Sequence, residues 1–303
     1  MSHELKKLIV IVGPTASGKT ALSIELAKKL KTEIISADSR QFYKEMAIGT
    51  AKPTPEELKQ ARHHFIDSHF ITETFSVGDF EQQGLATLEN IFKTHDTAIM
   101  VGGSGLYIKA ICEGFDDLPT ASSEIRSKLN HEFEEKGITH LQEKLKDADP
   151  VYYAQVDLNN PQRLIRALEV FEHTGVPFSS YRKSATNPRP FRCIKIGIDL
   201  PRQVLYQRIN HRVDEMVKQG LIEEVRSLLP YRHLNALNTV GYSELFDYFD
   251  DKSDLETAIA LIKQNTRRFA KRQMTWFRKD QGIKWLSPDE RDSVDIILSE
   301  PGY

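Results

Sequence analysis

Eight consecutive residues near the start of the chain have the spacing of a phosphate-binding loop. They match the pattern GxxxxGK[ST] and are Gly13, Pro14, Thr15, Ala16, Ser17, Gly18, Lys19 and Thr20. In such a loop the backbone N–H groups and the N-terminus of the following helix surround phosphate oxygens, the lysine adds a positive charge, and the last hydroxyl reaches a Mg²⁺ ion. The sequence therefore predicts a site for a di- or triphosphate, with Thr20 as the metal-binding residue.

The residues on either side supply the elements that position this loop. The apolar run 8–12 precedes it and indicates a buried strand, and Leu22, Leu26 and Leu30 recur at helical spacing after it. A strand, the loop and a helix in this order are the context in which the motif binds phosphate. The usual function of a protein with such a loop is nucleotide hydrolysis or phosphate transfer by a kinase. The residues at the ends of the other strands indicate whether this function fits the chain.

A polar cluster follows the second apolar run, 33–37. It consists of Asp38, Ser39, Arg40 and Gln41. Ligands bind at the carboxyl ends of strands in open α/β sheets, so we expect Asp38 to face the phosphate loop. An aspartate at this position is suited either to capping the next helix or to catalysis. Four polar groups exceed what a cap needs, and they are suited to hydrogen bonding with the edge of a planar base.

The third expected strand, 97–101, ends in glycines where an acidic residue is usual. Hydrolases and many kinases of this class place there the acid that orients Mg²⁺ or water, whereas this chain has Gly-Gly-Ser at 102–104. Such a turn lets a bulky ligand approach the backbone and lets Ser104 donate a hydrogen bond, although a tight turn alone also explains the glycines. Asp199, at the end of a later apolar run, is the remaining candidate for a metal-orienting acid.

Strand-like runs alternate with helical patterns over most of the chain, which predicts an α/β fold with a P-loop NTPase-like parallel sheet flanked by helices. The strand-like runs lie at 8–12, 33–37, 97–101, 193–200 and 283–286. The later helices are expected at 202–229, 241–249 and 255–278.

The interval from 118 to about 190 differs, because it contains helical patterns at 123–136, 139–145 and 161–174 and no convincing strand. We therefore expect a catalytic core domain of residues 1–117 and 197–303, interrupted by an all-helical insertion domain of residues 118–196.

Composition narrows the class of protein and its partners. The 303 residues carry 41 Lys and Arg against 43 Asp and Glu, a formal net charge of −2, so a nucleic acid would be bound by a local patch. Cys112 and Cys193 have neither metal-binding nor disulfide-framework spacing, which fits a reducing cytosol. No apolar run approaches 18 residues and no signal peptide is recognisable, so we expect a cytoplasmic protein.

Two acid-free basic stretches can supply the local patch. One spans 181–195 and contains Arg182, Lys183, Arg189, Arg192 and Lys195. The other is helical, spans 263–279 and contains Lys263, Arg267, Arg268, Lys271, Arg272, Arg278 and Lys279. Its helical spacing also groups Phe269, Gln273, Trp276 and Phe277 into an apolar anchor beneath a basic stripe. A solvated face is the usual explanation of a charge run, but this density favours a polyanionic partner.

Other cations lie on expected helices. Gln162 and Arg166 are one helical turn apart in the insertion, and Arg126 adds a third polar group there. Arg208 and Arg212 border the apolar stripe of the helix 202–229. Either one of this pair leans into the phosphate site, or both cover the apolar stripe with their methylene stems.

Taken together, these motifs resemble the tRNA dimethylallyltransferases, also called tRNA isopentenyltransferases, of the bacterial type. The matching segments run from residue 13 to 278 and read GPTASGKT, DSRQFY, GTAKP, HHFID, VGGSGLY, PQRLIRALEV, VGYSEL and RRFAKRQMTWFR. Their order, spacing and coverage of both expected domains make the joint match specific. The resemblance implies transfer of a dimethylallyl group from dimethylallyl diphosphate to N6 of the adenosine 3′ of the anticodon, with diphosphate as the second product and Mg²⁺ as cofactor.

The resemblance also implies roles for individual residues. Asp38 would accept the proton of the adenine amine, Thr15 would lie near the reacting diphosphate held by the loop, and Arg208 would stabilise the leaving group. The residues implied to contact the tRNA anticodon stem-loop are Asp38, Ser39, Arg40, Gln41, Ser104, Arg126, Gln162, Arg163, Leu164, Ile165 and Arg166. The insertion domain would grip the tRNA. We expect a monomer without membrane contact or an obligate protein partner.

Three alternatives stay open at this point. A P-loop small-molecule kinase would consume ATP, and an adenylate prenyltransferase would act on free nucleotides. A non-catalytic RNA-binding protein would keep the phosphate loop for structural reasons alone.

Overall fold

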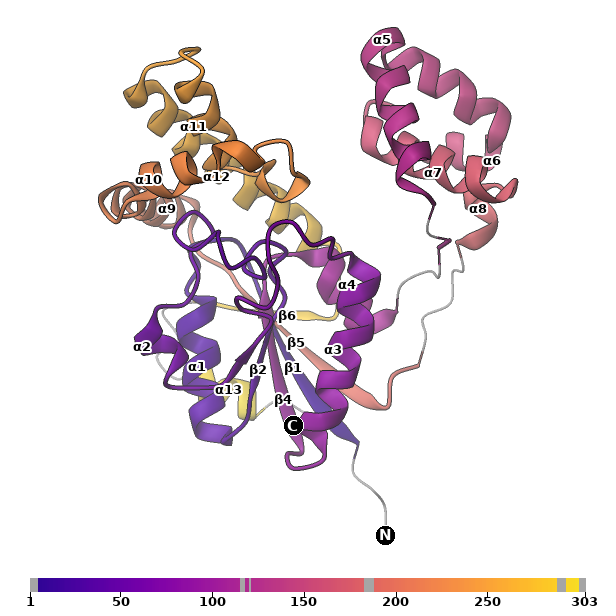
Figure 1. Ribbon diagram of the computed structural model, residues 1–303. Helices are drawn as coiled ribbons and strands as arrows, with labels where there is room; N and C mark the ends of the chain where they lie inside the picture. Colours follow the sequence, from indigo (N-terminus) through magenta and orange to yellow (C-terminus); the bar gives the residue numbers. More distant parts are fainter. Residues whose placement is uncertain (1–4, 115–117, 120, 183–187, 288–292, 300–303) are drawn as a thin grey trace. The chain divides into compact units, whose positions relative to one another are not determined.

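The structure is a computed structural model of the chain and describes residues 5–114, 118–119, 121–182, 188–287 and 293–299. The chain divides into two compact units, each described here by itself (Figure 1). The core unit comprises Met1–Glu113 and Pro188–Tyr303, and the insertion unit comprises Gly114–Asn187. The expected boundary at 196 is wrong, because it falls within a strand of the core sheet, Phe191–Ile198.

A six-stranded parallel sheet forms the centre of the core unit. Its strands are β1 (Lys6–Val12), β2 (Ile34–Ser36), β3 (His63–His64), β4 (Thr97–Gly102), β5 (Phe191–Ile198) and β6 (Ile283–Leu286), in the order β3-β2-β4-β1-β5-β6. β1 pairs with β4 on one side and β5 on the other, so the strand that precedes the phosphate loop lies inside the sheet. The five predicted strands are confirmed, whereas β3 was missed because two residues show no periodic pattern.

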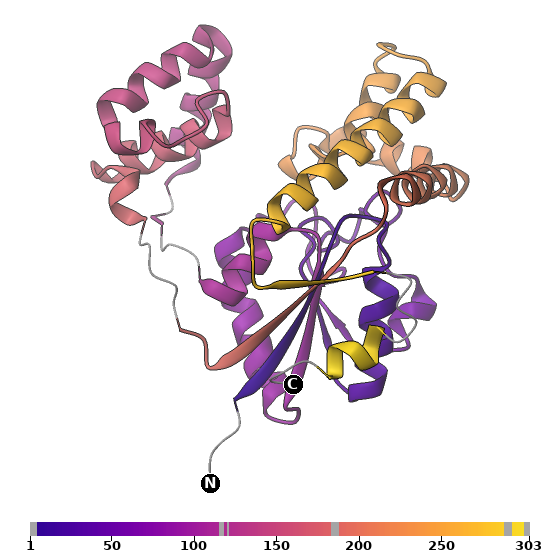
Figure 2. The same ribbon diagram turned by 180° about the vertical axis from the view of Figure 1, so that it is seen from behind.

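Helices cover both faces of this sheet (Figures 1 and 2). They are α1 (Lys19–Leu30) and α13 (Ser293–Leu298) on one face and α3 (Val77–Phe92) and α4 (Gly105–Glu113) on the other. Successive residues of β1 alternate between the faces: Ile11 packs with Leu26 of α1, and Val10 packs in the cluster of Phe80 of α3. Burial on both faces explains why the run 8–12 is uniformly apolar.

Four further helices lie beyond the carboxyl ends of the strands, where Figures 1 and 2 show them above the sheet. They are α9 (Arg202–Lys218), α10 (Leu221–Ser227), α11 (Tyr242–Phe249) and α12 (Leu255–Phe277). The single helix expected at 202–229 is wrong, because Gly220 adopts a φ of 103° and separates α9 from α10. Although α12 has 23 residues, neither it nor another helix in the described ranges is long and apolar enough to cross a membrane.

The described part of the insertion unit contains helices and no strand, as the sequence predicts. They are α5 (Ser123–Ala148), α6 (Pro150–Tyr153), α7 (Pro161–Thr174) and α8 (Phe178–Tyr181). Gly137 has a φ of 74° and breaks α5 into two helices, which matches the separate patterns at 123–136 and 139–145. Apolar residues of α5 and α7, such as Leu129 and Leu168, form a core that belongs to this unit alone.

Candidate active site

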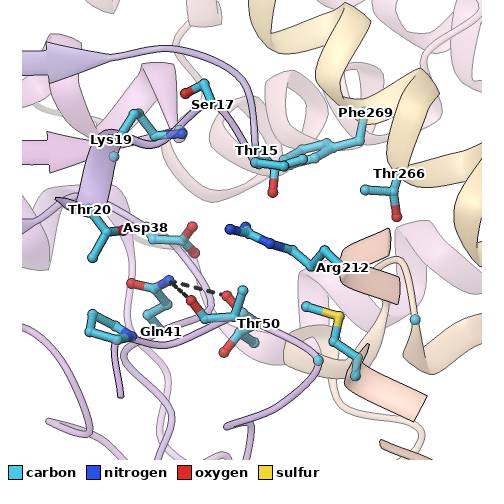
Figure 3. A pocket seen from close by; sticks show the side chains of 18 of the residues that line it. Thr15, Ser17, Lys19, Thr20, Asp38, Gln41, Thr50, Arg212, Thr266 and Phe269 are labelled. Atoms are coloured by element: carbon cyan, nitrogen blue, oxygen red, sulfur yellow. Dashed lines mark hydrogen bonds between the residues drawn. The ribbon is translucent and has the colours of Figure 1, made fainter. Parts of the chain in front are cut away.

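A cavity of about 280 Å³ lies in the core unit at the carboxyl ends of β1, β2 and β4. The phosphate loop and Asp38 line it from the sheet side, and residues of α9 and α12 line it from the helical side. Figure 3 shows the side chains of Lys19, Asp38 and Arg212 pointing into this space. Segments that are far apart in the sequence therefore meet at the strand ends, where the sequence predicts a site.

The backbone of the phosphate loop has positive φ angles at three positions. Gly13, Ala16 and Gly18 have φ values of 148°, 64° and 99°. A Cβ atom on Gly13 would lie 3.2 Å from both the Ile198 carbonyl oxygen and Ser17 Oγ, so glycine is favoured there for space as well as conformation. Ser17 Oγ is buried without a hydrogen-bond partner among the described residues. A buried hydroxyl in this state is costly, and an anion in the loop would satisfy it.

Lys19 and Asp38 are two half-buried groups of opposite charge. Burial lowers the pKa of Lys19 to about 7, the nearby Asp38 charge opposes this shift, and Arg212 adds to it. Burial likewise raises the pKa of Asp38, against the backbone N–H groups of Arg40 and Gln41 and the charge of Lys19. Asp38 Oδ1 accepts the Arg40 N–H at 2.9 Å. Asp38 therefore stabilises a turn and also faces the cavity. The helix-capping interpretation is wrong, because the next helix after β2 is α2 (Pro55–Leu58), and the catalytic role stays a prediction.

Gln273 of α12 joins two walls of the cavity. Its Oε1 accepts the Thr15 N–H at 2.9 Å, and its Nε2 donates to the Gly103 carbonyl oxygen at 3.1 Å. The side chain is 7% exposed. A Cβ atom on Gly103 would collide with the Gln273 amide, so the glycine turn admits this side chain. Sequence reasoning placed Gln273 in an apolar anchor and missed this role, although one polar residue among aromatic ones was a signal for it.

The two arginines of α9 differ in their position relative to the cavity. Arg212 is half-buried and lines it. Arg208 is exposed, and its Nη1 lies 4.0 Å from the position that a Cβ atom on Gly18 would occupy. Both therefore approach the phosphate loop, but Arg212 is the one that reaches the cavity interior. This placement favours Arg212 over Arg208, the residue expected from the sequence, as the cation nearest a bound ligand.

The polar cluster after β2 is largely occupied within the protein. Gln41 Nε2 donates to the carbonyl oxygens of Thr50 and Ala51, both at 3.1 Å, and Gln41 Oε1 accepts from Ser36 Oγ at 3.2 Å (Figure 3). Ser104 Oγ accepts the Ser39 N–H at 3.0 Å. The Gln41 amide therefore holds the neighbouring loop, the Ser104 hydroxyl holds the turn after β2, and contact of these residues with a base stays a prediction.

Oxygen groups suitable for Mg²⁺ are present but few. Thr20 and Asp38 both line the cavity, and hydroxyl, carboxylate and phosphate oxygens are the ligands that Mg²⁺ prefers. Among the described residues no group of three or more His, Cys, Asp or Glu could hold a metal ion. This donor set fits an ion bound mostly by substrate phosphates and water. Asp199 does not contribute: its carboxylate pairs with Arg278 at 3.2 Å, and it does not line the cavity.

In the insertion unit, a buried glutamate organises the predicted RNA-binding arginines. Glu169 is 5% exposed and accepts from Arg126 Nη1 and Arg166 Nη1, each at 3.2 Å. Arg126 Nη2 also donates to Gln162 Oε1 at 3.2 Å. Arg163 is exposed on the same helix.

Leu164 and Ile165 do not fit the predicted RNA contact. Both side chains are fully buried in the core of the insertion unit, because they lie on the inward side of α7. They hold the helix that carries Arg163 and Arg166 and cannot offer their side chains to RNA.

Acidic partners neutralise part of the basic stretch 181–195. In 181–195, Arg189 pairs with Glu81, and Lys195 Nζ lies 2.8 Å from Glu113 and 2.6 Å from Asp280, so these two cations are structural. Lys183 lies outside the described residues.

On α12 the predicted anchor is wrong for Phe269 and Trp276. Gln273 and Phe277 are buried, but Phe269 and Trp276 are 39% and 42% exposed. Arg268, Lys271, Arg272 and Lys279 surround Trp276 in a shallow groove. The basic stripe on this helix therefore includes an exposed aromatic ring.

The architecture and the loop define the class of protein. A phosphate loop after an inner strand of a parallel sheet covered by helices on both faces is the P-loop NTPase-like fold, here with a helical insertion. Within that class the chain belongs to the IPP transferase family, whose model matches residues 41–280. The family expected from the sequence motifs is confirmed.

Relatives match over nearly the whole chain. The tRNA dimethylallyltransferase of Christiangramia forsetii is 59% identical over 97% of this chain and 98% of the relative. That of Cytophaga hutchinsonii is 50% identical over 98% of each. Among solved structures, the tRNA isopentenylpyrophosphate transferase of Bacillus halodurans is 39% identical with a TM-score of 0.71, covering 97% of this chain and 95% of that one. A eukaryotic dimethylallyltransferase acting on tRNA is 27% identical with a TM-score of 0.80, covering 98% and 80%.

Proposed function

We infer that this protein is an enzyme that transfers a dimethylallyl group from dimethylallyl diphosphate to N6 of the adenosine 3′ of the anticodon in tRNA. Membership of the IPP transferase family supports the reaction class. The observation that carries the proposal is the joint presence of the phosphate loop and the half-buried Asp38 in one cavity. The loop suits a leaving diphosphate, and Asp38 suits the proton of the attacking amine.

The phosphate loop would hold the diphosphate group of the donor. Its N–H groups, Lys19 and Arg212 would stabilise the negative charge that develops as the allylic carbon–oxygen bond breaks. Mg²⁺, held by Thr20 and diphosphate oxygens, would add further positive charge to the same group. Thr15, whose N–H is fixed by Gln273, would place its side chain near the reacting diphosphate.

Asp38 would act on the acceptor. The N6 amine of adenine is a weak nucleophile because its lone pair is delocalised into the ring. As the new carbon–nitrogen bond forms, one amine proton passes to the Asp38 carboxylate, and diphosphate departs with the electron pair of the broken bond. The raised pKa of Asp38 makes it a better proton acceptor than an ordinary aspartate.

The helical side of the cavity is suited to the apolar parts of the reactants. It is lined by Val213, Met216, Val240, Ile262 and Phe269. These side chains offer contacts to a branched five-carbon group and to a flat base, and they would limit access of water to an electron-poor allylic carbon. A kinase would need instead a second polar pocket for its acceptor, and the turn after β4 lacks the usual acid.

RNA binding would bring the adenosine into this cavity. A base leaves the stack of an anticodon loop more easily than that of a duplex, so extrusion into a buried site has a moderate cost. Arg126, Gln162, Arg163 and Arg166 of the insertion unit have polar ends on its surface and would contact the stem-loop.

A donor and acceptor comparison tests the proposal. The protein is incubated with Mg²⁺, either dimethylallyl diphosphate or ATP as donor, and either an anticodon stem-loop or free AMP as acceptor. We expect a prenylated stem-loop from dimethylallyl diphosphate and no phosphate transfer from ATP. Prenylation of AMP without prenylation of the stem-loop would support the adenylate prenyltransferase instead, and phosphate transfer from ATP would support the kinase.

A further inference from the structure

The loop that follows the polar cluster has a fixed shape although it contains little regular structure. Its residues Gly49, Thr50, Ala51 and Pro53 line the cavity next to Asp38. This segment includes the motif GTAKP, and nothing in the proposed chemistry gives the motif a role. Besides Gln41, residues of α10 and α11 hold the loop, although these helices begin only at Leu221 and Tyr242.

Glu224 of α10 binds three successive backbone N–H groups of this loop. Its Oε2 accepts the N–H of Ala47 at 3.0 Å and that of Ile48 at 2.7 Å, and its Oε1 accepts the N–H of Gly49 at 3.0 Å. Hydrogen bonds to a carboxylate are about twice as strong as neutral ones. The Glu224 side chain therefore fixes the backbone of residues 47–49, where the cavity-lining segment begins.

Tyr242 of α11 completes this arrangement. Its hydroxyl donates to Glu224 Oε1 at 2.7 Å, and its ring is fully buried. A Cβ atom on Gly49 would lie 2.6 Å from that ring, so the loop packs directly on it. Burial and the adjacent Glu224 charge raise the pKa of Tyr242, which keeps the phenol protonated and donating. Tyr242 belongs to the motif VGYSEL, which likewise had no assigned role.

The loop in turn contacts the residues next to Asp38. The carbonyl oxygens of Thr50 and Ala51 accept from Gln41 Nε2. The backbone N–H of Arg40, the residue directly before Gln41, donates to Asp38 Oδ1 at 2.9 Å. Hydrogen bonds from Glu224 to the loop, from the loop to Gln41 and from Arg40 to Asp38, joined by the covalent backbone between them, thus link Glu224 to the turn that holds Asp38.

We propose that Glu224 is a positioning residue, which holds the 47–51 loop and, through Gln41, sets the Asp38 carboxylate for proton transfer. This role rests on the proposed function, because it assigns Asp38 to the acceptor amine. A carboxylate is required because four donors converge on its two oxygens, whereas a glutamine at 224 has one accepting oxygen and would oppose N–H groups with its own.

The test compares Glu224→Gln with Glu223→Gln, which removes an exposed charge from the neighbouring position of the same helix. We expect kcat for stem-loop prenylation to fall roughly tenfold to a hundredfold in Glu224→Gln, with the Kd for tRNA changed less than about twofold. Amide hydrogen exchange measured by mass spectrometry should accelerate in peptides covering 44–53 and not in the rest of the core unit. Glu223→Gln should match the wild type in all three measurements.

An unchanged kcat, or unchanged exchange in 44–53, in Glu224→Gln would overturn the proposal. Should this variant lose its fold, Tyr242→Phe removes a single hydrogen bond and keeps the ring. It should lower kcat about threefold to tenfold and expose the Gly49 amide to exchange, and wild-type values there would also overturn the proposal. If the wild-type protein prenylates no RNA, the proposed function fails, while the exchange comparison still decides whether Glu224 holds the loop.

Discussion

At the residue scale, the proposed chemistry depends on Lys19 and Asp38, whose charges influence each other in one cavity. Burial disfavours the charged form of each group, which lowers the pKa of Lys19 to about 7 and raises the pKa of Asp38. A bound diphosphate then restores the positive charge of Lys19, and the Asp38 carboxylate can take a proton from an amine. Two opposite roles therefore follow from a shared environment.

Replacing Asp38 by asparagine tests the role of the carboxylate. Asp38→Asn keeps the oxygen that accepts the Arg40 N–H and removes the proton acceptor. We expect kcat to fall by roughly two to four orders of magnitude, with tRNA binding close to the wild type. Asp147→Asn, at an exposed position of α5, is the matched control and should be fully active. Retention of turnover in Asp38→Asn would exclude Asp38 as the base.

The pKa of Lys19 predicts a proton uptake on ligand binding. With a pKa of about 7, the free lysine is mostly neutral at pH 8, and a diphosphate beside its amine raises the pKa again. Binding of inorganic diphosphate at pH 8 should therefore take up a proton, and affinity should weaken as the pH rises above 7. Titration calorimetry in buffers of different ionisation enthalpy measures this uptake.

Lys19→Arg is the control for this measurement, because arginine stays charged at pH 8 and above. In this variant only the protons of the ligand itself contribute to the measured uptake. Equal proton uptake by Lys19→Arg and the wild type would show that Lys19 does not titrate on binding.

The sequence predicts the loop and Asp38 because motif spacing and strand ends encode their positions. It does not decide between Arg208 and Arg212, which are one helical turn apart, since the packing of α9 against the sheet decides which guanidinium turns inward. Glu224 and Gln273 were missed for a related reason. Glu224 bonds to backbone groups up to 176 residues away and Gln273 to one 170 residues away, and no local pattern reports such a contact.

At the element scale, α12 connects the cavity to a basic surface. Gln273 on its inner side holds the phosphate loop and the glycine turn, while Arg272 and Trp276 lie on its outer side. A shift of this helix would change the position of Thr15 directly. The helix is thus suited to link binding of RNA to the shape of the diphosphate site.

Gln273→Leu tests this connection. The substitution keeps the approximate volume and removes both hydrogen bonds, which leaves the part-buried Thr15 N–H and the buried Gly103 carbonyl without this partner. We expect a loss of about 1–3 kcal/mol in the free energy of unfolding and a roughly tenfold weaker Kd for inorganic diphosphate. Gln264→Leu, at an exposed position of α12, should change neither. A wild-type diphosphate Kd in Gln273→Leu would contradict the link.

The bounds of a helix were easier to predict than the side that it buries. The extent of α12 differs from the prediction by one residue, because its helical pattern is long. Its buried side was wrong for Phe269 and Trp276, since helical spacing gives a stripe but not the width that the core covers. The break between α9 and α10 was missed because Gly220 ends a helix only through a positive φ, which many helical glycines do not adopt.

At the scale of the whole molecule, the chain separates a small-molecule site from a second set of basic groups. The cavity lies entirely within the core unit, and Arg126, Arg166 and Glu169 form their cluster entirely within the insertion unit. Each unit has a hydrophobic core of its own. Diphosphate binding and the RNA contacts of the insertion should therefore be separable by mutation.

Arg166→Gln tests this separation. Loss of one phosphate-contacting cation should weaken tRNA binding and lower the slope of log affinity against log salt by about 1. The Kd for inorganic diphosphate should stay at the wild-type value, because Arg166 belongs to the other unit. An unchanged salt dependence of tRNA binding would remove Arg166 from the RNA-contacting surface.

The division into two units was predicted from the change of periodicity, because strands disappear between 118 and 190. The exact end of the insertion was not, since the residues before β5 lack a helical or strand pattern, and the boundary was placed in the strand itself. The pairing of Arg189 and Lys195 with acids was also hidden, because Glu81, Glu113 and Asp280 lie on other elements.

The most direct test of the account is the stoichiometry of the two products. The protein is incubated with dimethylallyl diphosphate, Mg²⁺ and either an anticodon stem-loop with adenosine 3′ of the anticodon or the same RNA with guanosine there. We predict one diphosphate released for each N6-dimethylallyladenosine formed at that position, and neither product with the guanosine RNA. Diphosphate release without RNA prenylation, or prenylation of both RNAs, would contradict a leaving-group site coupled to that adenosine.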